Sequence, residues 1–303
     1  MSGAAWARRA RGAGAVLFWA FAQNLFILPW PPGRGVDIAR DPPAAWYRPI
    51  VPPVWGAALN VLVGALFLWW FVLRPGGRAD ARRRETFRLR PVPRAARPWA
   101  VAAAAGAAVA VNAALVVLPR FAGLPSREPV LEHYAGLPGG ALAIAAVAVC
   151  TAPFLEEFFF RGWAQGRLEW RASPWVAILV TAAVFAALHG LDAFGLALRA
   201  TLAVGLGYAA WATGSIWPSV GMHAAYNLSL FAGGAALPAL LPRPPRAEAW
   251  ADTERAALFF WAHEPGVFWP ALAVLALAAA VVVVALRRMA AAAGAGAGAH
   301  LET

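Results

Sequence analysis

Eight long apolar runs constrain the fold of this chain more than any other feature. They cover roughly residues 14–30, 54–73, 99–118, 139–160, 175–190, 196–213, 216–236 and 266–286. Each run approaches the ~20 apolar residues that a helix needs to cross a bilayer, and each is flanked by Pro, Gly or charge. Hydrophobic residues make up 61% of the sequence, far more than in a soluble domain. The sequence therefore predicts an all-α, polytopic membrane helix bundle with about eight transmembrane helices.

The polar gaps between the runs are short, so residues 1–289 are predicted to form a single transmembrane domain. Residues 290–303 are an Ala/Gly low-complexity tail, which is left out of the functional argument. The basic N-terminus before the first run resembles a signal peptide, but no small-residue cleavage site follows, so this run is expected to be a retained span. The single cysteine, Cys150, allows no disulfide framework within the chain.

The formal net charge is +11, all of the Lys and Arg positions are arginines, and most of them lie between the apolar runs. This placement indicates membrane topology and not a nucleic-acid surface, so no nucleic-acid partner is expected. Nine arginines lie between residues 74 and 97, which places this gap in the cytoplasm by the positive-inside rule. Both termini are then cytoplasmic, in a multi-pass protein of the cell (inner) membrane, and the gaps around 37–41, 128–132 and 248–264 are external. Anionic lipid headgroups are an alternative reason for the basic block.

Two adjacent carboxylates lie near the end of the fourth run, within T-A-P-F-L-E-E-F-F-F-R from Thr151 to Arg161. An ionised side chain at mid-membrane costs about 2.5–3.5 kcal/mol on insertion scales, so such residues usually face a bundle interior or a wet cavity. Glu157 and Arg161 have i,i+4 spacing and are predicted to pair, whereas Glu156 points about 100° away. Pro153 removes a backbone hydrogen bond and is expected to open the helix here. A helix end with charges reaching the headgroups is the alternative.

Two other runs carry imidazoles. The fifth contains V-F-A-A-L-H-G, in which Phe185 and His189 share a helical face, and the seventh contains G-M-H-A-A-Y-N, in which His223 and Asn227 do. A buried imidazole or amide needs a hydrogen-bond partner. Taken singly, each of these residues is also compatible with capping, packing or hydrogen bonding between helices.

The strongly polar side chains of the apolar runs are nearly confined to these two glutamates, Arg161, the two histidines and Asn227, with Arg199 the main remaining charge. Together they resemble one site. A carboxylate and an imidazole can deprotonate a water, while a second imidazole and an amide can donate hydrogen bonds to a developing oxyanion. This is the equipment for acyl-group hydrolysis without a side-chain nucleophile.

The motifs E-E-x-x-x-R, F-x-x-x-H and H-x-x-x-N, on separate runs and in this order, resemble those of the CAAX protease and bacteriocin-processing (CPBP, or Abi) membrane family. The resemblance covers about 140–235. It implies an intramembrane glutamic endopeptidase in which Glu156 and His189 activate the water and His223 and Asn227 hold the oxyanion. Glu157, Arg161 and Phe185 would then give structural support.

The resemblance leaves the cofactor open. The family was long described as metal-dependent, and Glu156, His189 and His223 would supply three ligands of a catalytic zinc with one open position. The H-E-x-x-H helix of soluble zinc proteases is absent from the sequence. We therefore favour a mechanism without a cofactor.

The implied partner is a protein or peptide substrate at the membrane. Prenylated CAAX tails are typical of eukaryotes, whereas the base-composition bias of this chain indicates a bacterium, so peptide precursors or C-terminal sorting tails are expected. A non-catalytic membrane scaffold, a bacteriocin self-immunity factor or a transporter of the same fold is the alternative class.

The run boundaries leave one problem of depth. Glu156 falls near the cytoplasmic end of its helix, whereas His189 falls near the external end of the next. Either the fourth helix continues toward Trp170 or the fifth is short and tilted, and the sequence does not choose between them.

Overall fold

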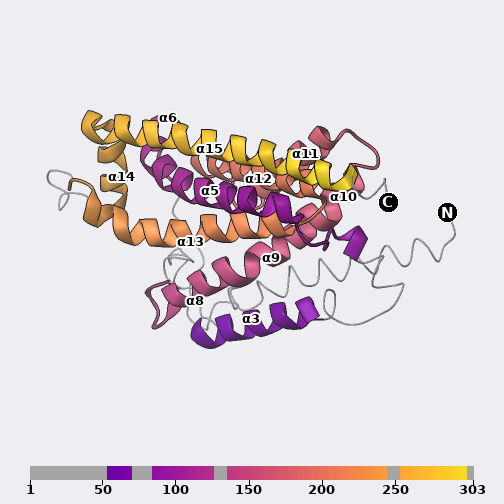
Figure 1. Ribbon diagram of the computed structural model, residues 1–303. Coiled ribbons are helices and arrows are strands. Elements are labelled where there is room, and N and C mark those ends of the chain that lie inside the picture. Colours follow the sequence, from indigo (N-terminus) through magenta and orange to yellow (C-terminus); the bar gives the residue numbers. More distant parts are fainter. Residues whose placement is uncertain (1–52, 70–83, 126–134, 244–252, 299–303) are drawn as a thin grey trace. The chain divides into compact units, whose positions relative to one another are not determined.

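The computed structural model describes residues 53–69, 84–125, 135–243 and 253–298 (Figure 1). All regular elements within these ranges are helices, and no strand forms there beyond an isolated bridge between Leu89 and Ser215. The prediction of an all-α fold is therefore confirmed. The first predicted run and the acidic residues expected in the first external gap lie outside the described ranges.

The helices follow the remaining seven predicted runs, with one addition. Their bounds are α3 Pro53–Leu68, η2 Arg94–Ala96, α5 Arg97–Val117, α6 Pro119–Ala122, α8 Gly140–Ala146, η3 Val147–Thr151, α9 Ala152–Glu157, η4 Phe158–Gln165, α10 Gly166–Leu168, α11 Pro174–Ala187, α12 Ala193–Thr213, α13 Trp217–Leu240, α14 Thr253–His263 and α15 Pro265–Gly298. The addition, α14, occupies part of a gap that the sequence analysis assigned to an external loop. The helix α15 continues through most of the Ala/Gly segment that we set aside as a tail.

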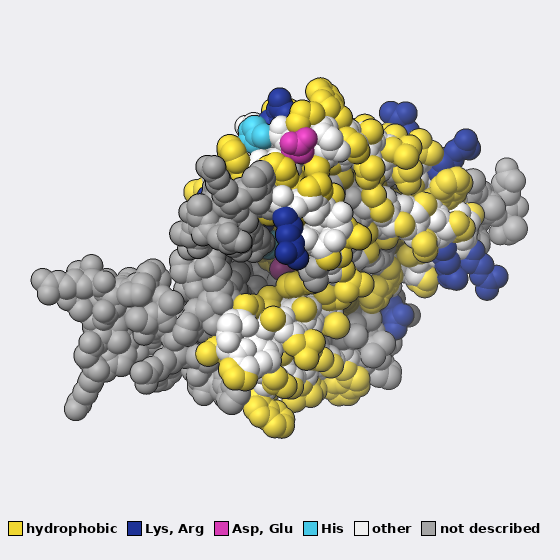
Figure 2. All heavy atoms as spheres, turned by 90° about the vertical axis from the view of Figure 1, so that its left-hand side faces the viewer, with side chains coloured by type: hydrophobic (Ala, Val, Ile, Leu, Met, Phe, Trp, Pro, Cys, Tyr) yellow, Lys and Arg dark blue, Asp and Glu magenta, His cyan; other side chains and the backbone are white. Residues whose placement is uncertain are grey.

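Four helical stretches are long and apolar enough to cross a membrane: Arg94–Val117, Gly140–Leu168, Ala193–Thr213 and Pro265–Gly294. Two shorter apolar helices, Val54–Leu66 and Pro174–Ala187, accompany them. Hydrophobic side chains cover much of the described surface in Figure 2, and several basic groups gather toward its right-hand side. This surface is suited to lipid, and the chain is a membrane protein.

Contacts divide the chain into two compact units. The first consists of Met1–Arg74 and Arg127–Phe159. Its described helices α3, α8 and η3 meet around Ala57 and Ala143, and α9 continues from η3. Inside this unit the buried Thr151 hydroxyl donates to Asn60 Oδ1 at 2.7 Å. A Cβ at Gly64 would lie 2.9 Å from the Thr151 methyl group, so the small residue allows α3 and η3 to approach closely.

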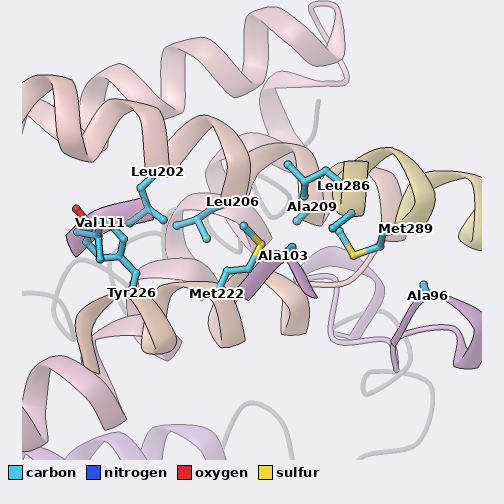
Figure 3. Close-up of a cluster of buried hydrophobic side chains, with 11 residues drawn as sticks. Ala96, Ala103, Val111, Leu202, Leu206, Ala209, Met222, Tyr226, Leu286 and Met289 are labelled. Atoms are coloured by element: carbon cyan, nitrogen blue, oxygen red, sulfur yellow. The ribbon is translucent and has the colours of Figure 1, made fainter. Parts of the chain in front are cut away.

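The second unit consists of Pro75–Ser126 and Phe160–Thr303. Its helix α5 packs against both α13 and α15. The order of contacts shows that α5 and α15 are antiparallel, because Ala96 packs in one cluster with Met289 and Val116 in another with Val267. Figure 3 shows the first cluster, where Leu202 and Leu206 of α12 lie near Met222 and Tyr226 of α13.

The basic segment before α5 is held at the turn between α12 and α13. The Ser215 hydroxyl donates to the Arg90 carbonyl at 2.7 Å, and the Ile216 N–H donates to the Arg88 carbonyl at 3.0 Å. The Arg88 side chain pairs with Glu169. This arrangement, together with the packing of Ala96 on Met289, gathers the basic ends of α5 and α15 at one end of the unit, as the topology argument requires.

Candidate active site

The helical stretch that carries the acidic motif is irregular on both sides of the two glutamates. Its π-helical segment Val147–Thr151 directly precedes Pro153, which is the second residue of α9. A proline has no N–H to donate, so the turn before it loses a regular α-helical hydrogen bond. A second π-helical segment, η4, follows Glu157. The opening expected at Pro153 is therefore present, and wide turns of this kind are frequent at functional sites.

Glu156 and Glu157 both lie in α9, at the end of the first unit. The Glu156 side chain is half-buried, whereas Glu157 is fully buried. The stretch continues past both residues to Leu168. The first of the two solutions to the depth problem is therefore observed, and α11 is also short, with 14 residues. The predicted pairing of Glu157 with Arg161, which belongs to the second unit, stays a prediction.

Arg161 lies in η4, within the second unit, and is fully buried. Its Nη2 donates to the Ala203 carbonyl of α12 at 3.0 Å, and its Cζ lies 4.9 Å from the ring centroid of Phe185 and 5.6 Å from that of Phe160. A guanidinium over aromatic faces within about 6 Å gains electrostatic attraction from the rings. Arg161 thus connects η4, α11 and α12.

Phe185 is the ring around which the predicted imidazoles gather. Its centroid lies 4.6 Å from that of His189 and 5.7 Å from that of His223, and in the second pair the rings meet edge to face. Phe160 packs on it from η4 with centroids 5.2 Å apart. The structure therefore brings His189 of the fifth run and His223 of the seventh to one buried phenyl ring.

The hydrogen bond at His189 fixes how its ring is protonated. Nδ1 lies 2.7 Å from the Phe185 carbonyl oxygen, which can only accept, so Nδ1 carries the proton. In the neutral imidazole the lone pair then lies on Nε2. The His189 backbone carbonyl accepts from Arg199 Nη1 at 2.7 Å.

His223 is buried and Asn227 half-buried, one turn apart on α13. Two polar contacts that the sequence analysis did not single out hold this helix. The Ser219 hydroxyl donates to the Leu206 carbonyl of α12 at 2.7 Å, and the Asn112 amide of α5 donates to the Ser229 hydroxyl. These contacts set the rotation of α13 and so the direction of its polar face.

Gln165 is another residue that the motif argument missed. It is fully buried, and its Nε2 donates to the Gly207 carbonyl of α12 and to Glu169 Oε1, both at 2.9 Å. Since Arg161 reaches Ala203 and Gln165 reaches Gly207, the two helices run parallel along this contact. A polar residue four positions after Arg161 is the sequence signal that would have indicated it.

The second unit does not hold a complete set of zinc ligands. A catalytic zinc takes three protein ligands, and no group of three or more His, Cys, Asp or Glu side chains suited to a metal forms among this unit's described residues. His189 and His223 therefore do not fit zinc by themselves. The predicted third ligand, Glu156, belongs to the first unit, so this set stays a prediction.

These features define a helical membrane protein in whose second unit His189, His223 and Arg161 gather around the buried Phe185 ring. Residues 138–229, which include all three motifs, match the family model described as type II CAAX prenyl endopeptidase Rce1-like. This segment is thus an Rce1-like domain of the CPBP family, a family of membrane proteases, as the resemblance of the motifs indicated. No curated protein and no solved structure matches the chain.

Proposed function

We propose that this protein is an intramembrane endopeptidase that hydrolyses a peptide bond in a membrane-associated protein or peptide precursor. The observation that carries the proposal is the meeting of His189 and His223 at Phe185, inside a segment that matches a protease family. Glu156, which comes from the first of the three sequence motifs, completes the proposed set as the carboxylate base.

In the proposed reaction the Glu156 carboxylate accepts a proton from a water molecule while the water oxygen attacks the scissile carbonyl carbon. His189 accepts a hydrogen bond from this water through Nε2, in agreement with its Nδ1–H bond to the Phe185 carbonyl. The oxyanion that forms accepts hydrogen bonds from His223 and the Asn227 amide. When the C–N bond breaks, the proton held by Glu156 passes to the leaving amine, which regenerates the carboxylate.

No metal takes part in the proposed reaction. The carboxylate and imidazoles perform the proton transfers, and the donors of His223 and Asn227 replace a Lewis acid at the oxyanion. Activity of purified protein should accordingly survive prolonged chelation, with no stoichiometric zinc by elemental analysis. Loss of activity on chelation and its recovery with zinc would instead support the ligand set Glu156, His189 and His223.

We further propose that the substrates are peptide precursors or C-terminal sorting tails, cleaved at the inner membrane by a protein with both termini in the cytoplasm. The Arg-rich segments gathered at one end of the second unit support this orientation. The absence of lysine from the sequence supports a bacterial setting, where prenylated tails are not expected.

The decisive experiment compares wild type with Glu156→Gln in proteoliposomes, using a randomised decapeptide library and mass spectrometry of the cleaved products. Wild type should release defined fragments, and Glu156→Gln should lower turnover at least ~1,000-fold, since it removes the base but keeps the shape. The control is Glu85→Gln, which changes an exposed glutamate paired with Arg90 and should cleave normally. A non-catalytic scaffold, immunity factor or transporter would show no cleavage that depends on Glu156.

A further inference from the structure

Four exposed arginines lie together at one end of the second unit and have no part in the proposed reaction. Two of them lie where η2 leads into α5, and two lie at the end of the apolar part of α15. They are Arg94, Arg97, Arg287 and Arg288. The buried Ala96 packs in one cluster with Leu286 and Met289, and η2 contacts α15 directly. The packing therefore brings these four residues, which we call the arginine group, to the same level of two antiparallel helices.

The arginine group has no carboxylate to balance it among the described residues. Neither α5 nor α15 contains an Asp or a Glu, and Glu85 and Glu169 of the neighbouring segments are each paired with another arginine. Within the described part of the chain, the side chains of the group make one hydrogen bond, from Arg97 Nε to the Val92 carbonyl at 3.2 Å. A guanidinium carries five N–H donors. The group therefore presents unbalanced positive charge and many N–H donors at the surface.

Three of these arginines lie one helical turn away from an exposed valine on the same helical face. The pairs are Arg97 with Val101, Arg287 with Val283, and Arg288 with Val284. The three valine side chains are 69%, 47% and 52% exposed, respectively. In α5 the valine follows its arginine, whereas in α15 each valine precedes its arginine. Because the two helices are antiparallel, the surface changes from cationic to apolar in the same direction on both.

Aromatic side chains mark the same level on α12. Tyr208 contacts both Trp175 and Trp211, with ring centroids 5.7 and 5.5 Å apart, and both tryptophans are exposed. The neighbouring Ala209 lies in the same buried cluster as Leu286, which directly precedes the two arginines of α15 (Figure 3). Trp and Tyr are enriched where the hydrocarbon of a bilayer meets its headgroups. The arginine group is therefore at the height expected for lipid phosphates.

We propose that the arginine group and the three exposed valines form a binding site for an anionic phospholipid. Guanidinium groups match phosphate oxygens with paired hydrogen bonds, and the acyl chains lie along the valines on the apolar side. A zwitterionic lipid brings no net charge to the arginines, and a soluble phosphate leaves the valines uncovered. A lipid bound here contacts the start of α5 and the end of α15 together, so it stabilises their packing. This inference does not depend on the proposed peptidase function.

Native mass spectrometry of the purified full chain in detergent measures the binding directly. The protein is titrated with phosphatidylglycerol and with phosphatidylcholine of the same acyl chains, and wild type should bind the anionic lipid at least about 10-fold more tightly. The double variant Arg287→Gln/Arg288→Gln should weaken the binding of phosphatidylglycerol about 30-fold, since each arginine near an anionic headgroup contributes about fivefold. Equal binding of the two lipids by wild type overturns the proposal.

Two further double variants separate the site from the net charge of the protein. Arg120→Gln/Arg243→Gln removes the same two charges from exposed arginines near the opposite end of the second unit, and it should bind phosphatidylglycerol as wild type does. Arg287→Lys/Arg288→Lys keeps the charge and should retain most of the binding, which guards against a misfolded glutamine variant. Equal losses in the control pair and in Arg287→Gln/Arg288→Gln would show an effect of net charge alone and would overturn the proposal.

Thermal unfolding distinguishes a lipid from a free phosphate. The probes are phosphatidylglycerol, phosphatidylcholine, sn-glycerol 3-phosphate and inorganic phosphate, each added at the same concentration to the protein in detergent. Phosphatidylglycerol should raise the Tm of wild type most, because a ligand that binds the folded state stabilises it, and Arg287→Gln/Arg288→Gln should lose this rise. An equal rise with either soluble phosphate, lost in the same variant, would mean that the valines contribute nothing and would overturn the assignment to a lipid.

Discussion

Phe185 is the residue that most clearly relates packing to the candidate chemistry. Its ring contacts both imidazoles and lies under the Arg161 guanidinium, while its carbonyl orients His189. Each aromatic pair contributes about 0.5–1.5 kcal/mol beyond burial. The side chain therefore holds two functional groups in place without being reactive itself.

Replacing Phe185 by Leu should lower turnover about 10- to 100-fold, because two ring contacts of this size are lost while the site stays filled. Turnover of the decapeptide library measures the effect. The matched control is Phe194→Leu, since Phe194 is also buried in the second unit but has no part in the ring cluster described above. Similar losses in both variants would mean that Phe185 contributes only bulk.

Glu157→Ala should lower the yield of folded protein, since loss of one partner leaves a buried charge uncompensated at a cost of about 3–5 kcal/mol. The measurement is the monodisperse fraction in size-exclusion chromatography after detergent extraction. Adding Arg161→Met to Glu157→Ala should restore much of the yield if the two residues pair. The exposed Glu85→Ala is the control, and a yield of Glu157→Ala equal to the control would contradict a structural role.

The sequence predicted one part of the site, and there is a physical reason why it missed the other part. Charged or imidazole groups in apolar runs are costly, so Arg161, His189 and His223 could be found by their cost alone. Gln165 and Ser219 are uncharged and bond carbonyls of another helix, and the uncharged Asn112 bonds the Ser229 hydroxyl of α13. A sequence does not say which carbonyls come close, so these contacts became visible only in the structure.

At the scale of elements, glycine sets the distance between α5 and α13. A Cβ at Gly233 would overlap with the Asn112 amide oxygen, whereas nothing lies within 4 Å of a Cβ at the neighbouring Gly234. The same helix thus has one glycine that the packing requires and one that it does not. This close approach lets the Asn112 amide reach Ser229 and fixes the rotation of α13.

The pair Gly233→Ala and Gly234→Ala tests this difference within a single turn. Gly233→Ala should lower Tm by several degrees and reduce turnover, because either the Asn112 side chain leaves its place against Ser229 or α13 moves to make room. Gly234→Ala should keep or slightly raise Tm, since alanine favours a helix by about 1 kcal/mol over glycine. Thermal unfolding followed by tryptophan fluorescence gives both values, and equal shifts would contradict the packing argument.

The elements themselves were well predicted, because apolar runs of membrane length leave the backbone few alternatives to a helix. The π-helical segments on both sides of Glu156 were not, apart from the opening expected at Pro153. The second segment, η4, contains no proline, and its Arg161 and Gln165 donate to carbonyls of α12. The sequence analysis also missed α14, whose sequence carries Glu254 and Arg255 among apolar residues, because it assigned this segment to an external loop.

At the scale of the whole molecule, the distribution of charge is the basis for the proposed orientation in the membrane. The basic segments before α5 and after the apolar part of α15 lie at one end of the second unit, and α14 lies near the other end of α5, against Val116. This arrangement agrees with a cytoplasmic Arg-rich end and an external α14.

Cysteine labelling of vesicles should verify this orientation. In a Cys150→Ala background, Arg90→Cys should react with an impermeant maleimide only in inside-out vesicles, and His263→Cys only in right-side-out vesicles. Both positions are exposed in the structure, so access from one side decides the labelling. The reverse pattern would invert the proposed topology, and labelling of both from the same side would contradict it.

The length of α15 has a consequence for what lies beyond the bilayer surface. Its 34 residues extend about 50 Å at 1.5 Å per residue, compared with ~30 Å of hydrocarbon. Arg287 and Arg288 mark the level at which the helix would leave the lipid, and Met289 and Ala292 still pack on the segment around Ala96. The turns of α15 after Arg288 extend the helix by about 15 Å beyond this level. The helix therefore continues past the expected lipid boundary as an ordered extension, which packs on the second unit as far as Ala292.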